Sequence, residues 1–208
     1  MVINMNILDL KNNIIKNLAE NQVLIVGIDG LGGAGKSTVS EELCKLFRDE
    51  NYSVTVLHID DFIHPKSVRY NENYEEWECY YNLQWRYDYF MNDVIMPIKN
   101  NGYFCGEIEL YDKDNDKYYF SKADIPSDGI VIVEGIFLQR SELEGIFDYM
   151  IFMDVPEEVR LSRVLKRDGY IGDEQQIRKK YENRYFPAEH RYTAQCSPVE
   201  RADYVING

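Results

Sequence analysis

The sequence predicts an α/β fold in which a parallel sheet is flanked by helices. Three observations predict it. Apolar, β-rich runs recur along the 208 residues, and several lack the alternation of strands with one solvated face, as expected for strands buried on both faces. Segments with helical periodicity separate these runs. The composition, with 45% hydrophobic and 13% aromatic residues, can supply a substantial core.

The expected elements follow in chain order. Residues 7, 10, 14, 15 and 18 are apolar at helical spacing, which predicts a short amphipathic helix at the start. The strands of a five-stranded parallel sheet are expected over 22–28, 53–59, 130–133, 149–155 and 204–206. Longer helices are expected over 36–50, 75–100, 156–167 and 173–185. The layers are therefore helix, sheet and helix.

One segment departs from this alternation of strands and helices. The stretch YFCGEIELYDKDNDKYYF, within residues 102–120, predicts two short antiparallel strands around a polar turn from Asp112 to Asp116. We expect a small β-hairpin inserted beside the main sheet.

The net charge limits the partners. It is −13, from 36 acidic and 23 basic residues, so the overall field would repel nucleic acid and anionic lipid. A ligand that carries phosphate would need a local cationic site. We therefore expect a small-molecule substrate and no nucleic acid or membrane partner. The acidic surface and the many tyrosines fit a monomer and a homodimer equally.

The cysteines and the apolar runs bear on location. The four cysteines are widely spaced without C-x-x-C, which favours reduced thiols and a cytoplasmic protein. The stretch MVINMNILDLKNNIIKNLAE lacks the basic start and apolar run of a signal peptide. No run reaches 18 uninterrupted apolar residues, so we expect no membrane span.

The most specific motif is GLGGAGKS, residues 30–37, which fits G-x-x-x-x-G-K-[ST]. Glycines let backbone N–H groups surround phosphate oxygens, and a helix that starts at Gly35–Lys36 points its positive end at the same anion. Lys36 is expected to reach the β- and γ-phosphates, Ser37 to bind Mg²⁺ and Thr38 to cap the helix. The expected nucleotide-binding residues are Gly30, Gly32, Gly33, Ala34, Gly35, Lys36, Ser37 and Thr38.

Two acidic residues follow expected strands. Glu134 ends the run IVIVE, and Asp60 follows the run SVTVLHI. The carboxyl ends of parallel strands share one edge of a sheet, so these acids and Ser37 are the expected Mg²⁺ ligands, and Asp60 is also a candidate base. The alternative is an ordinary acid at the solvated end of a strand.

Three arginines, Arg160, Arg163 and Arg167, have the spacing of one helical face, and DGYIG follows them. Two glycines could hinge a mobile cover, and arginines there would stabilise a transferring phosphoryl group. A solvated basic face is the alternative. Arg178 and Arg184 are further candidates on the next helix.

A phosphate loop alone fits either a kinase or a nucleotide-driven switch or motor. The guanine-reading N-K-x-D signature is absent, and there is no second ATPase module. The stretch RYNENYEEWECYYNLQWRYDYF is rich in aromatic and polar residues and could line a small-molecule pocket, although most of its aromatics are expected to pack.

The order of motifs is more specific. GIDGLGGAGKST, HIDDF, LYD, IVIVEGIF and a final ADYVING resemble the uridine kinase-like branch of the P-loop kinases, a group with phosphoribulokinase and the bacterial pantothenate kinases. The resemblance runs from about Val23 to the C-terminus. It implies a P-loop NTPase fold that uses ATP and Mg²⁺ in one kinase domain over 1–208. That domain would comprise a phosphate-loop unit over 22–50, a substrate-binding insertion with the hairpin over 62–120, and a lid over 156–188.

The resemblance also implies roles for single residues. Asp60 matches the base that accepts a hydroxyl proton, Lys36, Arg163 and Arg167 complete the catalytic set, and Asp61 is an extra acid. Tyr111 and Asp112 match the Tyr-Asp that lies at the nucleoside site of uridine–cytidine kinases. Trp85 and Arg86 are the other substrate-site candidates.

One feature departs from the family pattern. Uridine–cytidine kinases carry a base-reading histidine shortly after the Tyr-Asp, whereas the matching stretch here is KDNDKYY. A nucleoside is the first expected acceptor of the γ-phosphoryl group, and other hydroxyl compounds stay open. The alternative function is a regulatory or transport-linked P-loop ATPase without small-molecule kinase activity.

Overall fold

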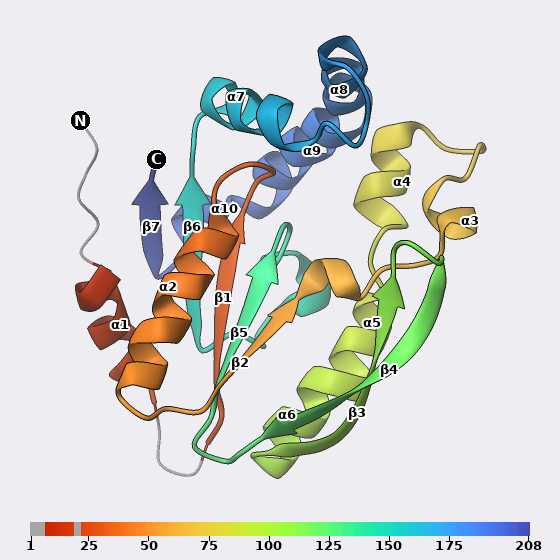
Figure 1. The fold of residues 1–208 in the computed structure, drawn as a ribbon. Coiled ribbons are helices and arrows are strands. Elements are labelled where there is room, and N and C mark those ends of the chain that lie inside the picture. The colour runs from red at the N-terminus through yellow and green to blue at the C-terminus, as the bar shows by residue number, and fades with distance from the viewer. Residues whose placement is uncertain (1–6, 19–21) are drawn as a thin grey trace.

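The computed structural model describes residues 7–18 and 22–208 and confirms the α/β fold (Figure 1). A parallel sheet is flanked by helices, and a two-stranded hairpin lies to one side. The strands of the sheet are β1 (Leu24–Gly30), β2 (Val54–His58), β5 (Ile130–Gly135), β6 (Tyr149–Asp154) and β7 (Tyr204–Asn207). Their spatial order is β2-β5-β1-β6-β7. Each strand begins and ends within two residues of its predicted bounds.

The two central strands explain the apolar runs of the sequence. Every residue of β1 and β5 is buried, because helices or connecting segments cover both faces. β5 lies between β1 and β2, with Glu134 beside Ile28 on one strand and His58 on the other. The carboxyl ends of β1, β2 and β5 therefore meet at one edge of the sheet, below α7 (Glu157–Arg167) and α8 (Glu174–Lys180) in Figure 1.

Helices α1 (Ile7–Ile15) and α2 (Lys36–Asp49) cover one face of the sheet. Leu10, Leu43 and Phe47 are fully buried there in one apolar cluster with the strands. The predicted N-terminal helix is confirmed, and residues 1–6 and 19–21 of the segment without a signal-peptide pattern lie outside the described residues. No helix of the described chain is long and apolar enough to cross a membrane.

The predicted helix over residues 75–100 is wrong, because the chain breaks it. α4 (Glu76–Asn82) ends, and Trp85 then forms an antiparallel bridge with Ile63. The backbone N–H of Arg86 donates to the carbonyl of Phe62 at 2.8 Å. These backbone groups pair across the insertion instead of within a helix, which brings Trp85 to the end of β2.

The insertion then continues as α5 (Tyr87–Tyr89), the π-helical η2 (Phe90–Ile95) and α6 (Met96–Asn101), which pack on the second face of the sheet. The helix predicted over 173–185 also contains a π-helical turn, η4 (Tyr181–Tyr185), and its continuation α9 (Phe186–Cys196) runs further than expected. Each π-turn is followed by a proline, Pro97 or Pro187. Proline lacks the N–H of the helical ladder and crowds the preceding turn, which wider turns relieve.

The hairpin is confirmed as β3 (Phe104–Asp112) and β4 (Lys117–Ile125). The Asp112 carboxylate accepts hydrogen bonds from the backbone N–H groups of Asp114 and Asn115, which fixes the predicted turn. The remaining short elements are η1 (Ile59–Asp61), α3 (Lys66–Arg69), η3 (Ser141–Leu143) and α10 (Pro198–Arg201). All four cysteines are free thiols, as expected.

Candidate active site

The glycine-rich loop joins β1 to α2 in a conformation that needs glycine. Gly33 has φ 81° and Gly35 has φ 98°. A Cβ atom on Gly33 would lie 2.9 Å from the carbonyl oxygen of Arg160, so the loop and α7 are in close contact. The predicted capping role of Thr38 is wrong, because Gly35 is the N-cap of α2 and no side chain caps the helix. The first N–H groups of α2 therefore stay available to an anion.

A buried ion pair supports the loop. Glu189 accepts hydrogen bonds from the backbone N–H of Gly32 at 2.9 Å and from Nη1 of Arg160 at 2.7 Å. Arg160 also donates to the carbonyl of Gly32 at 3.1 Å. Burial raises the pKa of Glu189, and the charge of Arg160 opposes that rise. Arg160 thus contacts the loop from a buried position, whereas Arg163 is exposed and donates to the carbonyl of Ala34 at 3.1 Å.

Lys36 lies inside the curve of the loop. Its Nζ donates to the carbonyls of Gly30 at 2.7 Å and Leu31 at 3.3 Å. Burial lowers the pKa of Lys36, although the charges of Glu134 and Asp29 oppose that shift. A partly buried ammonium whose hydrogen bonds go to carbonyls can bind an anion that enters the cleft.

The edge of the sheet next to the loop carries oxygen ligands. Ser37 Oγ donates to Oε1 of Glu134 at 3.3 Å, and His58 Nδ1 donates to Oε2 at 2.8 Å. Burial would raise the pKa of Glu134, but the hydrogen bond from His58 and the charge of Lys36 outweigh it and lower the pKa. A hydroxyl and carboxylates are hard ligands that suit Mg²⁺. Within the described ranges no three His, Cys, Asp or Glu residues form a group that could hold a metal ion.

Asp60 lies in η1, directly after β2, and faces the same cleft. Trp85 Nε1 donates to its Oδ1 at 3.3 Å, which fixes the orientation of the carboxylate. The neighbouring Asp61 lies 4.0 Å from the ammonium of Lys113 in the hairpin turn. Burial raises the pKa of Asp61, and the charge of Lys113 opposes this. The two aspartates therefore have different surroundings, one next to an indole and the other next to a lysine.

A cleft of about 920 Å³ connects these groups. The predicted site residues that line it are Gly32, Gly33, Gly35, Lys36, Ser37, Thr38, Asp60, Asp61, Glu134, Arg163 and Arg167. Gly30 and Ala34 contribute to the loop behind this lining through their carbonyl groups.

Four of the predicted substrate residues are not among the residues that line the cleft. Trp85 contacts the cleft through Asp60, and Asp112 belongs to the hairpin turn. Tyr111 is 3% exposed and its hydroxyl accepts a hydrogen bond from Arg69, a cleft residue, at 3.2 Å. Arg86 donates to Glu109 at 2.6 Å and lies over the rings of Tyr89 and Tyr118 beneath the hairpin.

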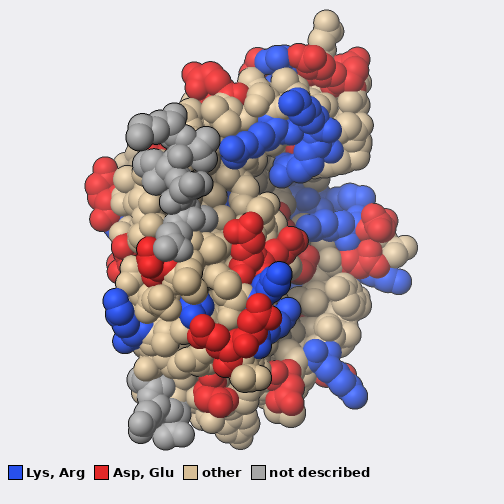
Figure 2. All heavy atoms as spheres, turned by 60° about the vertical axis from the view of Figure 1, so that its left-hand side comes forward, with Lys and Arg blue, Asp and Glu red and all other residues tan. Residues whose placement is uncertain are grey.

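The cleft also contains cations that the sequence analysis did not single out, Lys66, Arg69 and Lys113. These three residues belong to no sequence motif, so no pattern predicts that they line the cleft. Arg184, a further candidate, lines the cleft, whereas Arg178 pairs with Glu174 at 2.7 Å outside it. Figure 2 shows Lys and Arg side chains gathered over the upper part of one face, although the chain as a whole is acidic.

Comparisons with known proteins agree with this geometry. A family described as "AAA domain" matches residues 26–184. A uridine kinase from Staphylococcus epidermidis is 31% identical over 154 residues, which cover 71% of this chain and 70% of that protein.

Two solved structures share the fold. A structure described as a possible uridine kinase from Bacillus stearothermophilus has a TM-score of 0.79 and 29% identity, and it covers 99% of this chain and 100% of that one. The D-glycerate 3-kinase from Cryptococcus neoformans has a TM-score of 0.65 and 12% identity, covers 88% of this chain and 86% of that one, and shows the fold alone.

Proposed function

The chain belongs to the uridine kinase-like family of P-loop kinases, and we propose that it transfers the γ-phosphoryl group of ATP to a hydroxyl group of a small metabolite. The observation that carries the proposal is the cleft itself. Lys36 and the glycine-rich loop lie on one side of it, Asp60 and Glu134 on the sheet edge, and Arg163 and Arg167 on α7 above. Anion binding, a candidate base and cationic groups thus face one space.

Each group has a proposed task. The loop N–H groups and Lys36 would hold the β- and γ-phosphates, and Ser37, Glu134 and Asp60 would hold Mg²⁺, which would neutralise phosphate charge. Asp60 accepts the proton of the acceptor hydroxyl. Arg163 and Arg167 balance the charge of the transferring group, so most of the rate comes from positioning and charge neutralisation.

Arg167 is prepared for this task by its neighbours. Its guanidinium donates to the Asp168 carboxylate at 2.6 Å, and Asp168 is buried and also accepts from the Tyr181 hydroxyl at 2.6 Å. The hydrogen bond that Arg167 donates to Asp168 raises the pKa of Arg167, so the guanidinium stays charged. Val164, Ile177 and Tyr181 form a small apolar cluster, so the cover above the cleft has a core of its own.

The names of the relatives make a nucleoside the first acceptor to test. The free thiols support a reducing compartment, and we propose a cytoplasmic monomer or homodimer.

The experiment is incubation of the purified protein with ATP, Mg²⁺ and a panel of nucleosides, sugars and vitamins, followed by mass spectrometry. The proposal expects an acceptor that gains one phosphoryl group while ADP forms in equal amount. The rival function, a regulatory or transport-linked ATPase, predicts hydrolysis stimulated by a protein and no phosphorylated metabolite.

A further inference from the structure

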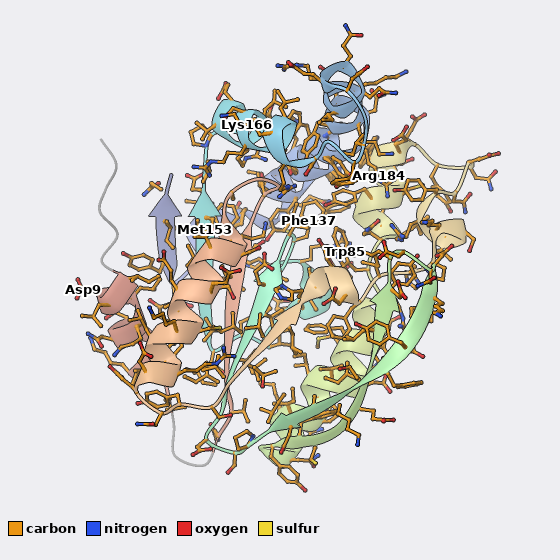
Figure 3. The ribbon with its side chains drawn as sticks, viewed as in Figure 1. Asp9, Trp85, Phe137, Met153, Lys166 and Arg184 are labelled. Carbon is orange, nitrogen blue, oxygen red and sulfur yellow. The ribbon has the colours of Figure 1, made fainter. Side chains whose placement is uncertain are left out.

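We propose that the acceptor of this kinase carries an anionic group, a carboxylate or a phosphate ester, which Arg69 and Arg184 bind. This inference rests on the proposed kinase function and narrows its acceptor class. Arg69 ends α3 in the insertion, and Arg184 lies in η4, where its side chain extends toward α4 (Figure 3). Both line the cleft.

Arg69 and Arg184 are in contact, and both lie over the same aromatic ring. Nη2 of Arg184 donates to the backbone carbonyl of Arg69 at 3.2 Å. Both guanidinium carbons lie over the ring of Tyr70, at 5.6 Å for Arg69 and 4.4 Å for Arg184. Tyr70 lines the cleft between them, and Lys66 of α3 lies at its exposed rim. The geometry is a group of three cations on one wall.

Both arginines are charged, buried and without an acidic partner. Arg69 is 7% exposed and Arg184 is 1% exposed. Among the residues that the structure describes, no carboxylate lies at salt-bridge distance from either guanidinium group. A buried cation without a counter-charge costs several kcal/mol. An anionic ligand would supply the missing charge.

Neutral acceptors hold the two side chains in place. Arg184 donates to the carbonyl of Glu76 at 3.0 Å and to Oε1 of Gln84 at 3.1 Å. Arg69 donates to the carbonyl of His64 and to the hydroxyl of Tyr111. That hydroxyl in turn donates to Asp116, an exposed acid of the hairpin turn whose charge also acts on Arg69 and Lys66 from beyond salt-bridge distance. These bonds orient both groups through neutral acceptors, so neither positive charge has a direct ion pair among the residues that the structure describes.

Four of the five acidic residues that line the cleft pair with other cations, and the fifth, Asp60, accepts a hydrogen bond from Trp85. Glu189 pairs with Arg160, Asp168 with Arg167, Glu134 with His58 and Asp61 with Lys113. They therefore cannot neutralise the wall formed by the three cations.

The ATP phosphates are a less suitable partner for these arginines. The arginines that hydrogen-bond to the phosphate loop are Arg160 and Arg163 from α7. Arg69 and Arg184 instead bond to the segments that form the insertion, at His64, Glu76 and Gln84. The insertion borders Asp60 through Trp85, on the side where an acceptor hydroxyl must approach. The cation wall therefore faces the acceptor.

The first test uses the wild-type protein with ATP, Mg²⁺ and matched acceptors that differ in charge: glycerate and glycerol, pantothenate and panthenol, ribose 5-phosphate and ribose, and uridine alone. Phosphorylated product is quantified by mass spectrometry. The inference expects product from at least one anionic member and at least tenfold less from its neutral partner. A comparison of the pairs whose anionic member is a carboxylate with the pair whose anionic member is a phosphate ester shows which anion is bound.

Two other outcomes are decisive. Product from uridine or a neutral partner at equal or higher kcat/KM would overturn this inference and leave the kinase proposal standing. Absence of product from every acceptor would count against the kinase proposal, and the inference would fall with it.

The second test uses variants with the preferred anionic acceptor. Arg69→Gln should raise its KM by about tenfold to one-hundredfold, the effect of losing one hydrogen bond to a charged group, while the KM for ATP stays the same. Arg178→Gln removes an arginine outside the cleft and should match wild type. Lys66→Gln, at an exposed position where folding is safe, should raise the same KM in a salt-dependent way. Unchanged KM values in both Arg69→Gln and Lys66→Gln would overturn the assignment.

Discussion

Glu189 connects the glycine-rich loop to α7 and α9, and its replacement tests how the loop is supported. The side chain is 1% exposed, and its two carboxylate oxygens serve two different donors, the N–H of Gly32 and the guanidinium of Arg160. In Glu189→Gln the amide oxygen can accept from only one of them. The amide NH₂ group then faces the other donor, so one hydrogen bond is lost and Arg160 remains buried without a counter-charge.

The size of the effect follows from this geometry. Removing one partner of a buried ion pair costs about 3–5 kcal/mol of unfolding free energy. For a chain of this length, 1 kcal/mol corresponds to about 2–4 °C in Tm, so Tm should fall by roughly 6–20 °C. The KM for ATP should also rise, because Gly32 belongs to the loop that binds phosphate.

Chemical and thermal unfolding of wild type and Glu189→Gln measure the loss of stability. The matched control is Glu174→Gln, which removes a carboxylate from an exposed pair with Arg178 on α8. An exposed pair contributes less than about 1 kcal/mol, so the control should resemble wild type. A Glu189→Gln protein as stable as the control would refute the view that this carboxylate supports the loop.

Two further predictions concern Lys36 and His58. Lys36→Ala should lower kcat by about 10²–10³, and normal turnover would contradict the phosphate-loop assignment. Burial lowers the pKa of Lys36, which means that the charged side chain is costly in the folded state. The Tm of Lys36→Ala should therefore not fall below that of wild type. The hydrogen bond to Glu134 raises the pKa of His58 above its usual 6.5, so its stabilisation is complete below pH 6.5 and is lost as the pH rises through the folded-state value. Unfolding free energies of wild type and His58→Gln should therefore converge between pH 6 and pH 9, and a pH-independent gap would contradict this.

The sheet and the phosphate loop could be predicted because their signals are local. Each buried strand is a short apolar run, and the motif from Gly30 to Ser37 lies between such a run and a helical pattern. The meeting of Asp60 and Glu134 at one edge follows from the parallel order of their strands. The hydrophobic pattern of the sequence and the parallel order of the strands were sufficient to predict these features.

The cleft wall could not be predicted, because long-range contacts form it. The break in the helix expected over 75–100 depends on pairing between Trp85 and Ile63. No sequence pattern near Trp85 predicts this break. Arg69 and Arg184 come together from positions 115 residues apart. Likewise Arg160 has the spacing of its neighbours Arg163 and Arg167, and only its ion pair with Glu189 distinguishes it as a buried residue that contacts the loop. Sequence spacing identifies a helical face but not what that face meets.

The measurement that tests the central claim most directly is single-turnover phosphoryl transfer by Asp60→Asn. Asparagine keeps the shape of the side chain and an oxygen that can accept the hydrogen bond from Trp85, but it cannot take a proton. With the acceptor identified by the panel, transfer should fall by about 10²–10⁴, while the affinity for ATP with Mg²⁺ stays near that of wild type. Transfer at the wild-type rate would contradict the assignment of Asp60 as the base of a small-molecule kinase.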